Sequence, residues 1–280
     1  MEYTSITAEQ LTDRPDPHTV TDSRTVYDGA IWDVRSESFR MAGQEEPLTR
    51  EFITHPGAVS VVVLDEKERI LLINQYRHPV RKRMWEIPAG LLDVSGEPAL
   101  QAAQRELGEE ADLTARTWHT LVDFDNSPGS SAEANRIFLA RDLSEVPESE
   151  RFEREGEEAE IVAGFADLDD AVAAVMAGRI TSPAATLGIL ATHIARSRDW
   201  ATLRAPDAEW TSRPRHEGCT TPSSRTVPSP NHCRSWTGDR GRVRRRRTRR
   251  PRRRPHRNCG GPWRVTWTTS WSSADSQRTP

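Results

Sequence analysis

Several features are missing from this 280-residue chain, and each absence excludes a class of protein. Residues 1–210 contain no cysteine, so disulfide bonds contribute nothing to a fold in that region. No apolar run approaches the roughly 18 residues of a transmembrane helix. The N-terminus also lacks the basic segment and following apolar run of a secretory signal. We therefore expect a cytoplasmic protein.

The last seventy residues, 211–280, contain no Leu, Ile, Phe, Tyr, Met or Lys. They hold 18 of the 39 basic residues, three of the 42 acidic residues and all three cysteines, which are not closely spaced. Three valines and four tryptophans are too few to offset the entropy lost on ordering seventy residues. We expect a disordered basic tail at 206–280, a folded acidic domain at 25–205 and a polar N-terminal arm at 1–24.

Two interpretations of this tail remain open. The arginines of Arg242–Arg254 could neutralise several phosphates while neighbouring tryptophans stack on bases, which indicates nucleic-acid binding. The acidity of residues 1–210 argues against that function. The composition is also typical of a GC-rich gene translated in the wrong frame from about Arg213 or His216, and this is the interpretation that we favour.

The folded region alternates strand patterns with helix patterns and shows no internal repeat. Strands are predicted at 26–35, 36–41, 48–55, 58–64, 70–76, 118–123, 136–140 and 161–166, with 58–64 and 70–76 forming a hairpin. Helices are predicted at 97–111, 167–177 and 183–196, the last capped by Ser182 with Pro183 in its first turn. This order predicts an α+β domain with α/β/α layers, in which a mixed sheet is flanked by helices.

The predicted helix at 97–111 carries an unusual set of acids. Glu106 and Glu110 are four residues apart and Glu109 is three from Glu106, so their side chains share one helix face. Like charges at that spacing destabilise a helix, whereas a hard divalent cation would hold them together. Carboxylates suit Mg²⁺ or Mn²⁺. The alternative is a solvated acidic helix, as in many globular proteins.

The stretch from Gly90 to Leu113 resembles the Nudix box, which runs Gly, five residues, Glu, seven residues, Arg-Glu-apolar-x-Glu-Glu-x-Gly-apolar. Gly90, Glu97, Arg105 and the three later acids match it. Six residues rather than five separate Gly90 from Glu97, and Asp112 stands where the second Gly is expected. Neither departure touches the acids, and the coincidence of so many spacings disfavours the solvated-helix alternative.

This resemblance implies a Nudix-like fold and a set of metal ligands. It assigns metal binding to Glu106 and Glu110, with Glu109 or Glu97 assisting and the carbonyl of Ala89 reaching a metal. Arg105 would hold the acids in place. The implied cofactor is Mg²⁺, with Mn²⁺ as an alternative.

The surroundings of the box resemble the ADP-ribose pyrophosphatases of this family. The segment 85–90 (WEIPAG) matches their approach to the box, and Pro128 stands where that subgroup has a proline. Arg50 and Arg77 lie in segments similar to its substrate-binding ones, and a guanidinium can grip phosphate oxygens in two places. The same residues could be an ordinary loop and two surface arginines. The implied reaction is Mg²⁺-dependent hydrolysis of ADP-ribose to AMP and ribose 5-phosphate; the alternative substrate is another nucleoside diphosphate sugar.

The acidic stretch at 155–160 is placed to carry the mobile catalytic base of related enzymes. We predict Glu157 as that base, with Glu158 second, and group Glu109 with the catalytic residues because its metal would position the water. A solvated charge run is the alternative for most of this stretch. The resemblance further implies a homodimer that pairs through the N-terminal strands.

Overall fold

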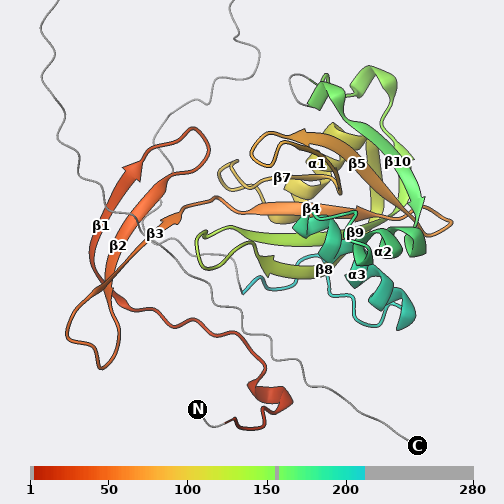
Figure 1. Cartoon of the computed structure of the whole chain (residues 1–280). Helices are drawn as coiled ribbons and strands as arrows, with labels where there is room; N and C mark the ends of the chain where they lie inside the picture. Colours follow the sequence, from red (N-terminus) through yellow and green to blue (C-terminus); the bar gives the residue numbers. More distant parts are fainter. Residues whose placement is uncertain (1–2, 155–157, 212–280) are drawn as a thin grey trace, which may run out of the picture. The chain divides into compact units, whose positions relative to one another are not determined.

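The computed structural model describes residues 3–154 and 158–211. Its strands and α-helices follow one another as β1 (Thr19–Tyr27), β2 (Val34–Arg40), β3 (Leu48–Ile53), β4 (Ala58–Val63), β5 (Arg69–Arg77), β6 (Lys82–Glu86), β7 (Ala89–Leu91), α1 (Ala99–Ala111), β8 (Leu113–Asp125), β9 (Ala134–Glu145), β10 (Val162–Asp167), α2 (Leu168–Met176) and α3 (Pro183–Ser197) (Figure 1). Single 3₁₀ turns occur at Ala8–Gln10, Glu148–Glu150 and Glu158–Glu160. Within these ranges no helix is both long and apolar enough to cross a membrane.

The strands form three sheets. One has the order β7-β4-β9-β8, in which β4 and β9 run parallel and the other neighbours antiparallel. A second has the order β10-β5-β6 and is antiparallel throughout. The third, β1-β2-β3, comes from the N-terminal part of the chain.

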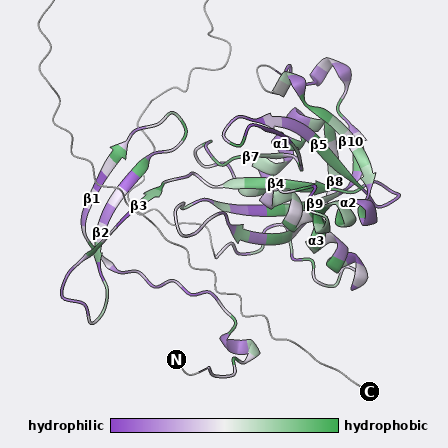
Figure 2. Cartoon of the chain, viewed as in Figure 1, coloured by the Kyte–Doolittle hydropathy of each residue, from purple (hydrophilic) through white to green (hydrophobic). Residues whose placement is uncertain are grey.

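Strand β4 lies at the centre of the core, and all six of its residues are buried. Alternate side chains of a strand point to opposite faces. Val59, Val61 and Val63 accordingly pack in the cluster that contains the buried face of α1, while Val62 and Leu64 pack with residues of α2 and α3. Hydrophobic colour runs along β4 in Figure 2. Helices therefore cover both faces of this sheet, and the predicted α/β/α layering is confirmed.

The predicted hairpin of 58–64 and 70–76 is wrong, although a tight turn does join the two strands. The Asp65 amide donates to the Arg69 carbonyl over 3.1 Å, and beyond it only the bridge Leu64–Ile70 is formed. Strand β4 then pairs with β7 and β9, whereas β5 pairs with β10 and β6. Both strands are therefore inner strands, and each obtains its two neighbours from outside the predicted pair. Buried inner strands read as continuous apolar runs, as these two do.

Strand boundaries also differ from the expectation. Strand β1 begins at Thr19, inside the segment predicted to be a loose arm, because the β-branched residues of TVTDSRTVY favour extended backbone. The predicted strand at 26–35 is interrupted between Tyr27 and Val34, where the Gly29 amide donates to the Asp33 carboxylate. Strand β6 was not predicted, because KRMWE has no apolar alternation. Pairing of β8 with β9 extends both well beyond their apolar centres.

The segment 204–210 packs against the domain, although residues from 206 onward were assigned to the tail. Arg136 of β9 is only 3% exposed and donates to the carbonyls of Ala208 and Glu209 over 2.6 and 3.0 Å. Its guanidinium also lies 4.9 Å from the centre of the Trp210 ring, which packs on the core. We call 204–210 the C-terminal latch. The tail expected beyond it, 212–280, lies outside the described residues.

Candidate active site

The close approach of β7 to α1 depends on Gly90. This residue pairs with Val59 of β4 and faces the helix. A Cβ atom at position 90 would lie 1.9 Å from Cδ of Glu106, closer than atoms can approach. The absence of a side chain at Gly90 therefore makes the space in which the Glu106 carboxylate lies.

Helix α1 begins at Ala99 rather than at Glu97, because Pro98 adopts an extended conformation and takes the N-cap position. Ala102, Ala103 and Leu107 form its buried face. Glu97 precedes the helix, yet its side chain turns back toward Arg105 in the second turn.

Arg105 lies at the centre of the acidic cluster. Its Nε and Nη2 donate to the two carboxylate oxygens of Glu97, each over 3.2 Å. Its Nη1 donates to Glu106 over 2.6 Å and to Glu109 over 3.0 Å. Burial opposes the charge of Arg105, but these hydrogen bonds and negative charges outweigh it and raise the pKa of Arg105 above its ordinary value. The guanidinium therefore offsets the repulsion among three carboxylates.

Glu110 is the fourth acid and is held in another way. Its side chain turns toward β7 and accepts a hydrogen bond of 2.8 Å from the Ala89 amide. The residue is 8% exposed. Burying an ionised carboxylate is costly unless it is hydrogen-bonded. The bond thus fixes Glu110 beside the strand that carries Gly90.

The chemistry of this donor set fits a hard divalent cation. Glu97, Glu106, Glu109 and Glu110 offer carboxylate oxygens and no thiolate or imidazole, as Mg²⁺ prefers. Across 3–154 and 158–211, no three acidic, histidine or cysteine side chains converge closely enough to enclose an ion. In this arrangement the contacts of Arg105 occupy three of the four carboxylates.

The predicted substrate-side residues lie in different places. Arg77, at the end of β5, is paired with the buried Glu86 of β6, to which Nη2 donates over 2.7 Å. Sequence reasoning missed Glu86, since the pairing of β5 with β6 was not foreseen. Arg50 is exposed on β3. Pro128 lies in an exposed turn whose Ser130 carbonyl accepts from the Ile53 amide over 2.9 Å, so the turn joins the end of the strand that carries Arg50.

The predicted base Glu157 lies outside the described residues, as does the side chain of Glu158. The segments on either side of 155–157 are attached to the domain. Arg154 donates to the Glu109 carbonyl of α1 over 2.7 Å, and Glu160 pairs with Arg83 of β6.

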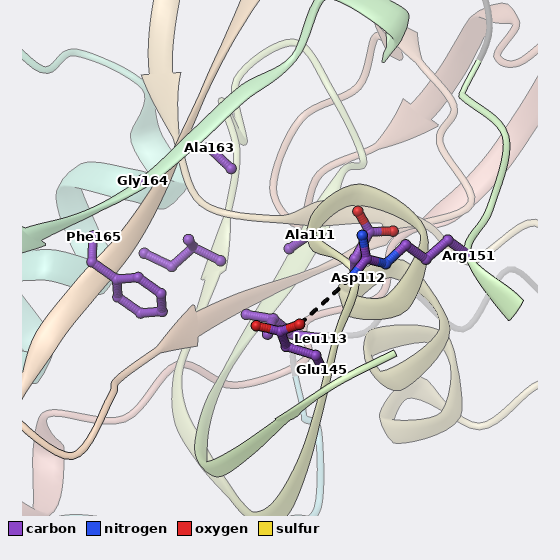
Figure 3. A pocket seen from close by; sticks show the side chains of 9 residues that line it. Ala111, Asp112, Leu113, Glu145, Arg151, Ala163, Gly164 and Phe165 are labelled. Atoms are coloured by element: carbon purple, nitrogen blue, oxygen red, sulfur yellow. Dashed lines mark hydrogen bonds and ion pairs between the residues drawn. The ribbon is translucent and has the colours of Figure 1, made fainter. Parts of the chain in front are cut away.

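A surface pocket of about 290 Å³ lies at the C-terminal end of α1 (Figure 3). Phe165 lines one end, and Asp112 and Arg151 line the other. None of the four acids held by Arg105 and Ala89 lines it. The pocket is thus separate from the acidic cluster.

Comparison with known proteins identifies the family. The NUDIX domain model matches residues 54–183, which contain the acidic cluster. The ADP-ribose pyrophosphatase of Mycobacterium tuberculosis is 43% identical over 192 residues, which cover 69% of this chain and 90% of that protein. The chain belongs to the Nudix hydrolase family.

Two further proteins are similar to this chain, one in sequence and one in structure. The ADP-ribose pyrophosphatase of Bacillus subtilis is 33% identical over 46% of this chain and 69% of that protein. A solved structure of an ADP compounds hydrolase covers 68% of this chain and all of its own, with a TM-score of 0.53. At 17% identity, that likeness shows the fold alone. Nudix hydrolases generally use divalent metal ions, which agrees with the donor set of the cluster.

Proposed function

We propose that this Nudix hydrolase cleaves the diphosphate of ADP-ribose in the presence of Mg²⁺. The observation that carries the proposal is the gathering of Glu97, Glu106 and Glu109 around Arg105, with Glu110 held at Ala89. Two relatives named as ADP-ribose pyrophosphatases, one 43% identical, support the choice of substrate.

In the proposed reaction, Glu106 and Glu110 would hold the metal, assisted by Glu97 or Glu109 and the Ala89 carbonyl. A divalent ion held there would supply charge neutralisation for the diphosphate and would favour a nucleophilic water. Arg105 keeps the acids oriented. Glu157, or else Glu158, accepts the water's proton as its oxygen forms a bond to phosphorus, a contribution on the order of 10²–10⁴-fold. The bridging P–O bond breaks and releases AMP and ribose 5-phosphate.

Arg50, Arg77 and Pro128 are proposed to bind the substrate. Arg77 is the best supported, because Glu86 orients its guanidinium through Nε and Nη2. A planar guanidinium held in this way can grip phosphate oxygens.

One comparison favours a second candidate substrate. A CMP-5'-(N-acetyl-N-hydroxy-3-aminopropyl)phosphonate hydrolase from Streptomyces rubellomurinus is 31% identical over 60% of this chain and 78% of that protein. A CMP-linked phosphonate is therefore a further candidate substrate, beside ADP-ribose and other nucleoside diphosphate sugars.

We further propose a homodimer that pairs through the N-terminal strands. All nine residues of β1 are exposed, among them Val20, Val26 and Tyr27. An exposed edge strand offers unpaired backbone groups to a second copy. Sedimentation equilibrium tests this: a monomer at micromolar concentration contradicts it.

The decisive assay follows AMP release from ADP-ribose by the full chain with Mg²⁺, beside a panel of CMP- and UDP-linked compounds. We expect Glu106→Gln and Glu110→Gln to abolish release while thermal unfolding stays cooperative. Glu66→Gln, in an exposed turn, is the matched control and should remain active. Full activity in either cluster variant refutes the site. Preference for a CMP compound keeps the site and replaces the substrate.

A further inference from the structure

The C-terminal end of α1 has an unfavourable charge distribution. The negative end of a helix dipole lies there, and cations rather than anions stabilise it. Glu109, Glu110 and Asp112 nevertheless crowd this end, and the last turn contains no basic residue. The helix that carries the metal-binding acids therefore needs positive charge from elsewhere in the chain.

Arg154 supplies that charge from the segment that follows β9. Its Nη2 lies 2.9 Å from the Asp112 carboxylate, and its Nε donates to the Glu109 carbonyl over 2.7 Å. Both side chains are about three-quarters buried, with 23% and 24% exposed. The Glu109 carbonyl is one of the four that a helix end leaves without a partner in the helix. Arg154 thus caps the helix as well as neutralising its end.

The side chain of Asp112 contributes a contact that its backbone conformation does not require. With φ 56° and ψ 32° it adopts the left-handed conformation that usually favours glycine. Its amide donates to Gly108 over 3.1 Å, and its carbonyl accepts from the Val146 amide over 2.8 Å. A glycine would make the same backbone bonds with less strain. The carboxylate is therefore the feature that an aspartate adds here, and it contacts Arg154.

We propose that Asp112 and Arg154 are positioning residues that fix the last turn of the metal-binding helix. This inference rests on the proposed function of that helix. Arg154 holds the carbonyl of Glu109, while Arg105 holds its carboxylate. One guanidinium group thus holds the backbone of Glu109 and another holds its side chain. The backbone of Glu110 follows in the same turn, so its position depends on the same contacts. Asp112 acts by holding Arg154 in place.

The experiment compares Arg154→Gln, Asp112→Gly and the double variant in the full chain. Asp112→Gly keeps a backbone suited to its conformation, so it reports on the carboxylate even if Arg154→Gln fails to fold. Arg151→Gln is the matched control, because Arg151 lies in the same segment but bonds to Glu145 and Val146 rather than to α1. Hydrogen exchange of peptides spanning 107–113 is measured without metal or substrate, and Mn²⁺ affinity is measured without turnover.

We expect severalfold faster exchange at 107–113 in both single variants and about tenfold weaker Mn²⁺ binding, as for residues that support metal ligands. The two residues act as a unit, so their effects should not add. The double variant should bind Mn²⁺ as tightly as the weaker-binding single variant, and its exchange at 107–113 should be no faster than that of the faster-exchanging single variant. Arg151→Gln should match the wild type.

Unchanged exchange, or changed exchange with unchanged Mn²⁺ affinity, overturns the proposal, because the pair would then be absent or merely structural. Additive effects also overturn it. The proposed substrate fails separately: a wild type that binds Mn²⁺ but leaves ADP-ribose intact refutes that substrate and leaves the positioning pair standing.

Discussion

The carboxyl group of Glu106 lies in the space where a side chain at Gly90 would begin. The two residues come from different elements, β7 and α1, and are sixteen positions apart in the sequence. The contact shows why the motif needs a residue without a side chain at its start.

Gly90→Ala should therefore inactivate the enzyme. A Cβ 1.9 Å from Glu106 Cδ must displace that carboxylate or the strand. We expect kcat for the preferred substrate to fall about 100-fold, the usual cost of a small misplacement in an active site. Gly108→Ala is the control, because its Cβ would meet nothing within 4 Å. Alanine in a helix should raise stability by about 0.5–1 kcal/mol there. Normal turnover in Gly90→Ala would contradict the assigned role.

Arg105→Gln should reduce stability in a metal-dependent manner. Removing the guanidinium takes a charged partner from Glu97, Glu106 and Glu109. A hydrogen bond to a charged group contributes about 1.5–3 kcal/mol, and partial exposure of Arg105 weakens each of these contacts, so the unfolding free energy should fall by about 1.5–3 kcal/mol in total. Millimolar MgCl₂ should restore more stability in the variant than in the wild type. Arg116→Gln, at an exposed position on β8, serves as control. If Mg²⁺ raised the stability of both variants equally, Arg105 would not be the residue that offsets the repulsion among the acids.

His55 should make stability depend on pH. Burial lowers the pKa of His55 below its ordinary value, against the opposing charge of Glu133, and Nδ1 accepts a hydrogen bond from the Gly57 amide. A lowered folded-state pKa means that the unfolded chain binds the proton first. Stability is therefore complete above the ordinary pKa of about 6.5 and is lost as pH falls through the folded-state value.

The measurement is the melting temperature at a series of pH values from about 7.5 to about 5.5, on either side of that ordinary pKa. His55→Gln removes the titrating group, so its melting temperature should fall less than that of the wild type. His78→Gln, at an exposed position, should follow the wild type. Parallel curves for His55→Gln and wild type would show that the group has no effect.

The C-terminal latch should determine where the domain ends. A chain that stops after Ala205 loses the two carbonyls that accept from the buried Arg136, and it loses Trp210. An unsatisfied buried donor costs about 1–3 kcal/mol, so this chain should unfold at a clearly lower temperature than one that stops after Thr211. Equal melting temperatures would support the predicted domain boundary at 205.

The acidic cluster was predictable from the sequence because its geometry is local. Helical spacing alone places Glu106 and Glu110 on one face. The resemblance to the Nudix box adds Arg105, which contacts Glu97, Glu106 and Glu109. Layered architecture also follows from apolar patterns, since five of the six residues at 58–63 are apolar and they occupy both alternating sets of positions. Features that depend on local spacing can therefore be predicted from the sequence.

Long-range pairing was not predictable in the same way. The apolar pattern in 58–64 and 70–76 is the same whether the strands pair with each other or with β9 and β10. The sequence therefore could not show that the predicted hairpin was wrong. The contact of Arg154 with Asp112 joins residues that only the fold brings together. Trp210 lies just before the arginine-rich region, and the predicted boundary at 205 placed it in the tail.

The pairing of Val59 with Gly90 gives β4 a second role. A slip of one residue in a strand moves every side chain to the opposite face. In β4 such a slip would exchange the valines of the two cores and would also carry Gly90 away from Glu106. The packing of β4 in the hydrophobic interior therefore also sets the position of Gly90 relative to Glu106. Substitutions that change the volumes of the β4 side chains leave this register intact. An insertion or deletion in β4 would instead reduce both the stability of the fold and the activity.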